Sequence, residues 1–360
     1  MLSDGLTLGR ALLLSLLLMV FVLQLGALID YHSLSNDEKA HSLAGYLYLE
    51  TGEFQNGFAN PPFLQLLFAL PYVLSSAEMA EVKAEPPYLA RGVNALLGFL
   101  LIIALCFFAY HHFGFQSSVF TLALGVTSPT IVAHSSIATT DIGVSLFGLL
   151  FFALLHRAHS ENSWGIFLSS SLCLALACVS KFTALVFFPI GVLLSLASPF
   201  LFSRPWMRVL KEILLMLLVV WLVFSSCYCF EGCFETPGAW APPGLARLAW
   251  VFPNMAVKSF CEKVLTSREN LPLHHYFSLS RSTIAWVYYP SIAIFKLPPG
   301  SLCSLLLFFF FLLKYRMRGD PLYCYTILPA GLFFLSMASN QFHDGIRHLL
   351  PALVLVYGAI

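Results

Sequence analysis

Long apolar runs separated by short polar connections dominate this 360-residue sequence. A helix that spans a bilayer needs about 20 mostly apolar residues, and ten of the runs approach that length. They predict helices at 10–30, 88–110, 115–133, 142–156, 164–179, 182–202, 212–229, 299–313, 320–338 and 348–360. Because helices satisfy their own backbone hydrogen bonds in lipid, we expect an all-α polytopic membrane protein with about ten spans.

One further apolar run, at 62–77, breaks this pattern. It is short, follows Pro61 and contains Pro71. A stretch of this length is more typical of an interfacial or re-entrant helix than of a span. We therefore predict juxtamembrane helices between the first and second spans. The run at 10–30 could be a signal peptide, but it is long for one and lacks a small-residue cleavage pattern, which favours a first spanning helix.

Two cationic segments orient the chain. They are "SRPWMRVLK", which begins at Ser203, and "KYRMR", which begins at Lys314. Short loops rich in lysine and arginine stay in the cytoplasm. Counting outward from these two segments places 134–141, 180–182, 230–298 and 339–347 on the extracytoplasmic side. If 62–77 does not span, the first loop lies on that side as well.

This topology predicts one transmembrane domain over 1–360. Its first extracytoplasmic loop would cover 31–87 and its long one 230–298, and a soluble C-terminal domain is not expected. Composition agrees with a membrane protein, because 59% of the residues are hydrophobic and 10% are charged, against roughly 45–50% and 25% in soluble domains. The net charge of +1 provides no basic field for nucleic acid.

The nine cysteines do not predict a metal site, because their spacing matches no standard zinc motif. A disulfide between Cys233 and Cys261 is left open, since the long loop would face an oxidising compartment.

Ionisable and aromatic side chains gather on the predicted outer side. They are Asp37, Glu38, His41, Asp141, Lys181, His274, His275, Tyr289, Lys296, His343 and Arg347. Ionisable groups at membrane depth are costly and usually face a cavity or a partner. Carboxylates and cations together suggest a site that handles an anion and moves a proton.

Each of these residues also has an ordinary structural explanation. Ser35 and Glu38 fit a capping box, and Asp141 fits the acidic first turn of a helix. Lys181 and Lys296 could extend toward the interface. The histidines could be loop surface, and Tyr289 could belong to an aromatic belt at the membrane surface.

The sequence resembles the polyprenyl-phosphate-sugar glycosyltransferases of the GT-C fold. Within them it is most similar to protein O-mannosyltransferases (glycosyltransferase family 39) and to bacterial lipid A aminoarabinose transferases. The likeness rests on fragments that occur in order: "NDEKAHSLAGYLYLETGEF", "NPPFLQLLFALP", "ARGVNALLG", "SPTIVAHSSIATTDIGVSLF", "ALACVSKFTALVFFP", "LPLHHYFSLS", "WVYYPSIAIFKLPPG" and "GIRHLLPAL". The family's His-Pro-Pro is Asn60-Pro61-Pro62 here, which puts any role of that histidine in doubt.

The resemblance implies a role for each matching residue. Asp37 matches the first-loop acid that serves as catalytic base, with Glu38 beside it, and Asp141 matches the second-loop acid. The cations that would hold the lipid phosphate are Lys181, Lys296 and Arg347. Substrate contacts are expected from His41, His274, His275, Tyr289 and His343.

The expected function is transfer of a sugar from a polyprenyl-phosphate donor, with inversion, to a hydroxyl or phosphate acceptor on lipid, glycan or protein. We expect it in a bacterial inner membrane, with the site extracytoplasmic. No cofactor is expected, and a divalent metal between the two acidic loops is left open. The alternatives are a transporter or flippase of an anionic lipid or sugar, and an inactive scaffold subunit that kept the fold.

Overall fold

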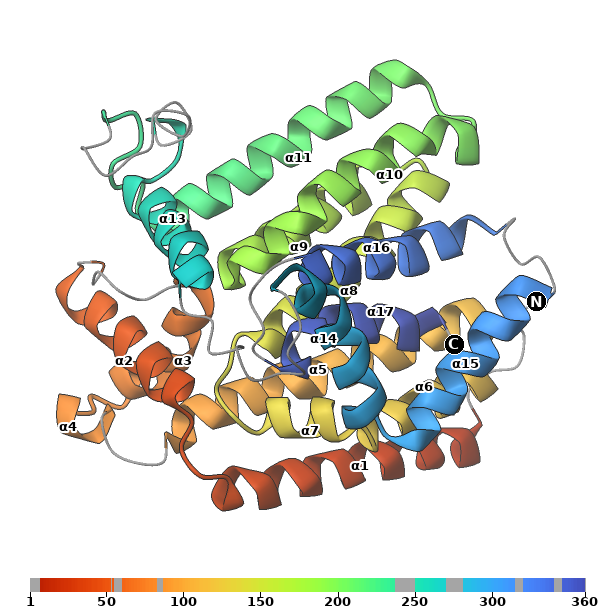
Figure 1. Cartoon of the computed structure of the whole chain (residues 1–360), viewed down its shortest axis with the longest axis horizontal. Coiled ribbons are helices and arrows are strands. Elements are labelled where there is room, and N and C mark those ends of the chain that lie inside the picture. Colours follow the sequence, from red (N-terminus) through yellow and green to blue (C-terminus); the bar gives the residue numbers. More distant parts are fainter. Residues whose placement is uncertain are drawn as a thin grey trace.

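The structure is a computed structural model that describes residues 7–52, 54, 60–82, 87–236, 250–269, 281–314, 320–339 and 345–359. Within these residues every regular element is a helix (Figure 1). The first half contains α1 (Leu8–Tyr31), α2 (Asn36–Thr51), α3 (Phe63–Leu74), α4 (Met79–Val82), α5 (Tyr88–Phe113), α6 (Phe115–Val126), α7 (Pro129–Ser135), α8 (Asp141–Ser160) and α9 (Trp164–Ser180). The second half contains η1 (Phe182–Val186), α10 (Phe187–Phe202), α11 (Trp206–Cys227), α13 (Asn254–Glu269), α14 (Arg281–Lys296), α15 (Pro299–Lys314), α16 (Pro321–Ser339), η4 (Ile346–Leu349) and α17 (Leu350–Ala359).

The all-α membrane fold is confirmed, and the described residues of each predicted run are mostly helical, but the count of about ten spans is not confirmed. Six described helices are long and apolar enough to cross a membrane: α1, α5, α8, η1 with α10, α11 and α16. Two bent pairs raise this to at most eight. The bend is 64° between α6 and α7, and 117° between Trp286–Lys296 and Pro299–Phe308. α9 and the η4–α17 segment are shorter apolar helices.

The centre of the bundle is α8, and α1 lies at its edge. Of the apolar window of α8, 67% is buried, against 11% for α1. α8 packs against α9, α5 and α17. α17 is buried along its whole length. The core therefore lies where these helices meet, and α1 presents most of its surface outward.

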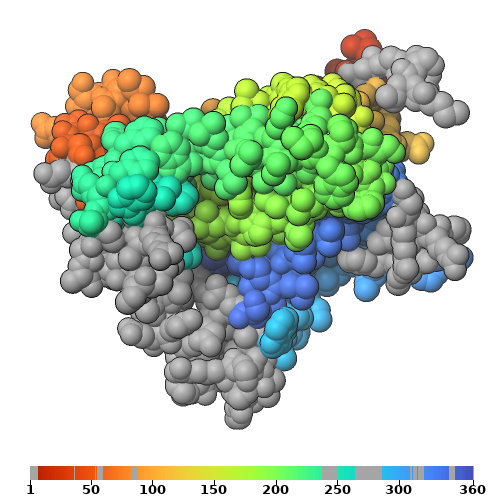
Figure 2. All heavy atoms as spheres, turned by 90° about the horizontal axis from the view of Figure 1, so that it is seen from above, coloured from red at the N-terminus to blue at the C-terminus, as the bar shows by residue number. Residues whose placement is uncertain are grey.

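One broad face of the bundle is covered by α10 and α11. Figure 2, which looks onto that face, shows these green helices running from the end that carries α2 and α13 toward the opposite end. α11 exposes an apolar stripe made of Leu210, Leu214, Leu217, Leu218 and Leu222. Exposed leucines at helical spacing are expected where a helix faces lipid.

The short helices α2 and α3 lie together with α13 at one end of the bundle (Figure 1, left). α3 has 12 residues, so at 1.5 Å per residue it is too short to cross a hydrocarbon core of about 30 Å. This length agrees with the prediction that 62–77 is not a span, which stays a prediction. Gly45 allows close packing, because a Cβ there would lie 1.9 Å from the Gln65 carbonyl oxygen. This contact fixes α2 against α3.

The opposite end differs from its prediction. α11 begins at Trp206, directly after Pro205, so it includes residues that the sequence analysis placed in a cationic loop before 212. Proline is well suited to a helix start because its φ angle is already helical and its missing N–H is not needed there. Because the helix starts earlier, Glu212 lies within its second turn, near Arg204. The two side chains form a buried ion pair.

Candidate functional site

A buried carboxylate fixes the start of α2. Glu38 is fully buried, and its Oε1 accepts a hydrogen bond from Arg91 Nε at 2.8 Å. Its Oε2 accepts from Arg91 Nη2 at 3.0 Å and from the Ser35 backbone N–H at 2.9 Å. The Ser35 contact is the capping interaction that the sequence predicted. Glu38 is thus held by α5 and by its own helix start.

The same ion pair ties three segments together. Arg91 also donates to the backbone carbonyl oxygens of Ile29, His32 and Ser33, where α1 ends. Glu38 Oε1 also accepts the Ala138 backbone N–H at 2.9 Å. Ala138 precedes α8, whose first residue is Asp141. The Glu38–Arg91 pair therefore sets the position of α2 relative to the start of α8.

Asp37 faces a different partner from its neighbour Glu38. Arg347 Nη1 donates to Asp37 Oδ2 in an ion pair that joins residues 310 positions apart. The Asp37 side chain is 42% exposed and that of Arg347 is 19% exposed. Arg347 lies in η4, just after Gly345 at φ +89°, a backbone angle that suits glycine. The Gly345 N–H donates to Tyr288 Oη at 3.0 Å, which anchors this turn to α14.

A second ion pair lies at the start of α8. Lys181 Nζ donates to Asp141 Oδ1 at 2.6 Å, and both side chains are almost completely buried. Asp141 opens α8 and Lys181 follows the end of α9. Because α8 and α9 are consecutive antiparallel neighbours, these two positions meet. The helix start also favours a negative side chain at Asp141.

His41 is close enough to both ion pairs for their charges to act on it. It follows Asp37 by one turn of α2, it is buried, and the charges of Asp37, Lys181 and Asp141 all act on it. The charge of Arg347 also acts on Asp141, so the two pairs form one electrostatic cluster. Burial lowers the pKa of His41 from 6.5 to about 4, although Asp37 opposes this shift. The imidazole is therefore neutral near pH 7, and among the described residues its Nδ1 has no hydrogen-bond partner.

The remaining predicted site residues lie elsewhere or outside the described residues. Lys296 is exposed at the last position of α14 and forms no ion pair within the described part of the chain. Tyr289 is buried in the apolar core beside Tyr288. His274, His275 and His343 lie outside the described residues.

Sequence reasoning missed Arg91 and Asn94. Asn94 Nδ2 donates to the carbonyl oxygens of His134 and Ile137, which shape the turn that leads to Asp141. Both residues interrupt the apolar run 88–110. An arginine in such a run needs a partner, and this signal indicated a buried carboxylate without saying which one.

The cluster consists of carboxylates, cations and imidazoles. Among the described residues, no group of three or more His, Cys, Asp or Glu side chains is arranged to hold a metal ion. All nine cysteines are free thiols, so Cys233 and Cys261 are not joined. A partly exposed carboxylate can accept a proton, while the fixed cations next to it can stabilise an anion at the same place.

Comparison with solved structures identifies the architecture. ArnT from Cupriavidus metallidurans in the apo state superposes with a TM-score of 0.60 at 16% identity, over 97% of this chain and 58% of that one. The fold is that of a GT-C glycosyltransferase. ArnT bound to undecaprenyl phosphate gives the same TM-score at 17% identity, over 97% of this chain and 59% of that one. The apo oligosaccharyltransferase of Archaeoglobus fulgidus gives 0.59 at 12% identity, over 99% of this chain and 50% of that one.

Comparison with family models gives one match to part of the chain. The model of the family described as Dolichyl-phosphate-mannose-protein mannosyltransferase matches residues 78–229. This segment is less than half of the chain, and it contains Arg91, Asp141 and Lys181. No curated protein sequence matches the chain. The chain spans between half and three fifths of the length of the solved structures described above.

Proposed function

We propose that this chain transfers a sugar from a polyprenyl-phosphate donor to an acceptor hydroxyl at the membrane surface. The observation that carries the proposal is the cluster of the Asp37–Arg347 and Asp141–Lys181 ion pairs with His41, on which charges from both pairs act. It lies where long apolar helices begin and end, which is where the head group of a lipid donor emerges. The donor class is supported by the shared fold of ArnT, which has been solved with undecaprenyl phosphate.

Asp37 is the proposed general base. The acceptor hydroxyl gives its proton to the Asp37 carboxylate while its oxygen forms a bond to the anomeric carbon. The bond from that carbon to the phosphate oxygen breaks, and its electron pair leaves with the lipid phosphate. Attack opposite the leaving group inverts the anomeric configuration. Asp37 suits this role because its side chain is 42% exposed and because a positioned carboxylate can contribute about 10²–10⁴-fold to rate.

Lys181 and Arg347 are the proposed partners of the phosphate. A lysine ammonium has three N–H donors, so Lys181 can keep its bond to Asp141 and still present donors to a phosphate. A guanidinium has five N–H donors in a planar fork, which allows Arg347 to hold Asp37 and reach a phosphate oxygen. Fixed cations stabilise the charge that develops on the leaving group. Burial strengthens this effect, since water screens it less.

Glu38 and His41 have supporting roles in this scheme. Glu38 accepts hydrogen bonds from the Ser35 N–H, from Arg91 and from the Ala138 N–H, so we assign it as a positioning residue for Asp37. The charges of both Asp37 and Lys181 act on His41, so we assign it to contact the transferred sugar. Its neutral imidazole can donate or accept a hydrogen bond to a sugar hydroxyl.

The proposed side is extracytoplasmic, in a bacterial inner membrane. Arg204 in the turn from α10 to α11 and Arg208 in the first turn of α11 lie at the end of the bundle opposite α2 (Figure 1). Short loops rich in arginine and lysine stay in the cytoplasm. This orientation directs Asp37 and Arg347 outward.

The test replaces Asp37 by asparagine in proteoliposomes supplied with a labelled polyprenyl-phosphate sugar and a membrane extract as acceptor. We expect transfer to fall by about 10²–10⁴-fold and donor binding to change little. The matched control is Asp30→Asn, an exposed aspartate at the end of α1, which should transfer normally. Unchanged transfer by Asp37→Asn would remove Asp37 as the base. Labelled lipid that crosses the bilayer with its sugar bond intact would favour the flippase alternative.

A further inference from the structure

The two cations proposed to hold the donor phosphate are each already paired with a carboxylate. Arg347 Nη1 donates to Asp37, and Lys181 Nζ donates to Asp141. Each carboxylate repels an incoming phosphate, and this repulsion opposes the attraction of its cation. A phosphodiester has two oxygens that accept hydrogen bonds readily. A further N–H donor that is not paired with a carboxylate would therefore strengthen binding.

His134 is near both of these cations. It lies close to the end of α7, and the charges of Asp141, Lys181 and Arg347 all act on it. α7 also contacts η4, the turn that carries Arg347. No salt bridge joins His134 to a carboxylate within the described part of the chain. A phosphate held by Lys181 and Arg347 would therefore lie near an imidazole that has no carboxylate of its own.

The backbone of α7 holds His134 in a defined place. Its carbonyl oxygen accepts a hydrogen bond from Asn94 Nδ2, on α5, at 2.7 Å. The next residue, Ser135, packs so closely on Gly98 of α5 that a Cβ at Gly98 would clash with the Ser135 hydroxyl. α7 is thus fixed against α5 on both sides of this peptide. The His134 ring therefore starts from a rigid backbone, as a ligand-binding side chain should.

The two ring nitrogens of His134 differ in their surroundings. Nδ1 is buried and has no hydrogen-bond partner among the described residues, whereas the residue as a whole is only half-buried. Nε2 is therefore the nitrogen that a ligand can reach. A buried N–H without an acceptor is rarer than a buried acceptor without a donor, so we expect the ring proton on Nε2. Nε2 then carries an N–H whether the ring is neutral or protonated.

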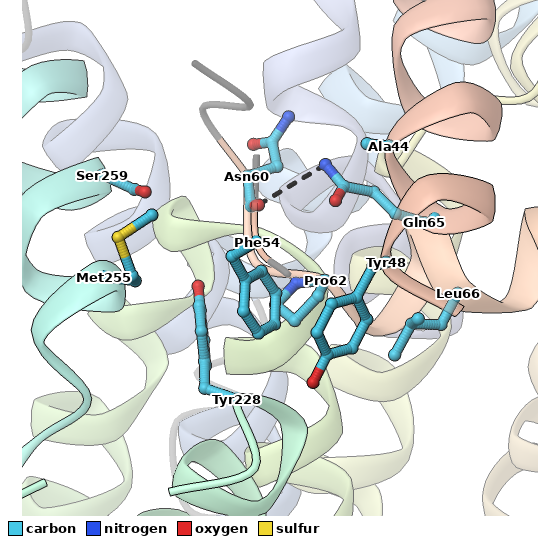
Figure 3. Close-up of a pocket in the computed structure, with 11 residues that line it drawn as sticks. Ala44, Tyr48, Phe54, Asn60, Pro62, Gln65, Leu66, Tyr228, Met255 and Ser259 are labelled. Atoms are coloured by element: carbon cyan, nitrogen blue, oxygen red, sulfur yellow. Dashed lines mark hydrogen bonds between the residues drawn. The ribbon is translucent and has the colours of Figure 1, made fainter. Parts of the chain in front are cut away.

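The hollow beside α2 does not offer the phosphate another place. Residues of α2, α3 and α13 line it, and the rings of Tyr48, Phe54 and Tyr228 pack on one another there (Figure 3). It has room for about one water molecule. None of the described residues that line it is a lysine, arginine or histidine. A phosphate would find neither a cation nor enough space in it.

We propose that His134 donates a hydrogen bond from Nε2 to the phosphate of the lipid donor, as a third contact beside Lys181 and Arg347. The word donor rests on the proposed function, whereas the binding of a lipid phosphate does not. The three contacts come from α7, from the end of α9 and from η4. Contacts from three segments fix the orientation of the phosphate, and with it the direction of the bond that breaks in transfer.

The experiment measures the dissociation constant of undecaprenyl phosphate by native mass spectrometry of the full chain released from detergent micelles. His134→Leu should bind about 10–100-fold more weakly, because a hydrogen bond to a charged group is lost. His134→Gln, whose amide N–H can take the place of the Nε2–H, should bind within about threefold of the unchanged protein. The matched control is His111→Leu, an exposed histidine near the C-terminal end of α5, which should bind normally.

A second ligand separates a phosphate contact from a structural role. Undecaprenol has the same tail without the phosphate, so it should bind equally to all of these proteins. The variants should also fold, because Nδ1 has no partner to lose among the described residues and the Asn94 bond is to the backbone. Loss of undecaprenol binding in His134→Leu that matches the loss of undecaprenyl phosphate binding would overturn the proposed contact.

The same measurements separate this proposal from the proposed function. Binding of undecaprenyl phosphate that depends on His134, in a chain that transfers no sugar, would support the contact and remove the proposed function. Sugar transfer by a chain that binds undecaprenyl phosphate equally well with leucine at this position would do the reverse. Inorganic phosphate that binds as tightly as undecaprenyl phosphate would also overturn the contact, since the site would then not hold a lipid phosphate.

Discussion

The two ends of the helix bundle both use carboxylates and cations, but in different arrangements. At the end opposite α2, Glu212 is fully buried and bonded to Arg204, and its Oε1 accepts from Arg208 Nε at 3.1 Å. Arg204 also donates to Ser198 Oγ at 3.0 Å and to Asn162 Oδ1 at 3.3 Å. One carboxylate there serves two arginines, and these bonds join the turns before α9 and α11.

At the α2 end, the Asp37 and Asp141 carboxylates each form one salt bridge, to Arg347 and Lys181 respectively. Asp37 is partly exposed, and His41 Nδ1 has no partner in the described part of the chain. The same residue types can therefore fasten helices or provide reactive groups. The difference lies in exposure and in the number of cations that each carboxylate binds, not in composition.

The largest effect on stability is expected at the end opposite α2, where Glu212 binds Arg204 and Arg208. Glu212→Ala would leave Arg204 and Arg208 without their carboxylate in a buried position, which should destabilise the folded protein by about 3–5 kcal/mol. Unfolding in mixed micelles measures this effect. The control Glu161→Ala removes the exposed Arg157–Glu161 pair, with side chains 53% and 48% exposed, and should cost under about 1 kcal/mol. Equal costs for the two variants would contradict the distinction between the ends.

A pH-dependent effect is expected at the α2 end. Burial lowers the pKa of His41 to about 4 from 6.5, so between these values the unfolded chain binds a proton that the folded chain does not. Stability present above pH 6.5 should therefore be lost as the pH falls toward 4, by up to about 3 kcal/mol. His41→Gln should show a shallower slope, whereas His111→Gln, an exposed histidine in α5, should keep the slope. Identical slopes for His41→Gln and the unchanged protein would contradict the buried neutral imidazole.

A smaller effect is expected from the packing that holds α2. In Gly45→Ala the new Cβ would meet the Gln65 carbonyl oxygen, so α2 and α3 must separate, at a cost of about 1–3 kcal/mol. Because Asp37 is on α2, transfer per folded molecule should fall as well. Gly92→Ala in α5, where nothing lies within 4 Å of the added Cβ, should leave both stability and transfer intact. Normal transfer by Gly45→Ala would show that the site tolerates movement of α2.

The helices were predictable from sequence because long apolar runs are a strong local signal. Pro61, Pro71 and the short length of 62–77 also predicted a short helix there, and α3 has 12 residues. The number of spans was not predictable, because the bend between α6 and α7 depends on packing. The sequence does not show which of two adjacent acids is exposed. Glu38 is the buried one because it pairs with Arg91, which lies 53 positions away in the sequence. Such a pairing is a property of the folded chain.

The central claim is that the cations at the α2 end bind a lipid phosphate, whereas those at the opposite end hold helices together. The most direct test is the dissociation constant for undecaprenyl phosphate of the unchanged protein, of Asp141→Asn with Lys181→Met, and of Lys211→Met. The double variant removes both charges of the pair, so no unpaired ion is left buried. Losing one charge-assisted contact of about 1.5–3 kcal/mol should weaken its binding by about 10–100-fold. Lys211→Met, an exposed lysine in the first turns of α11, should bind normally, and equal affinity in all three proteins would contradict the claim.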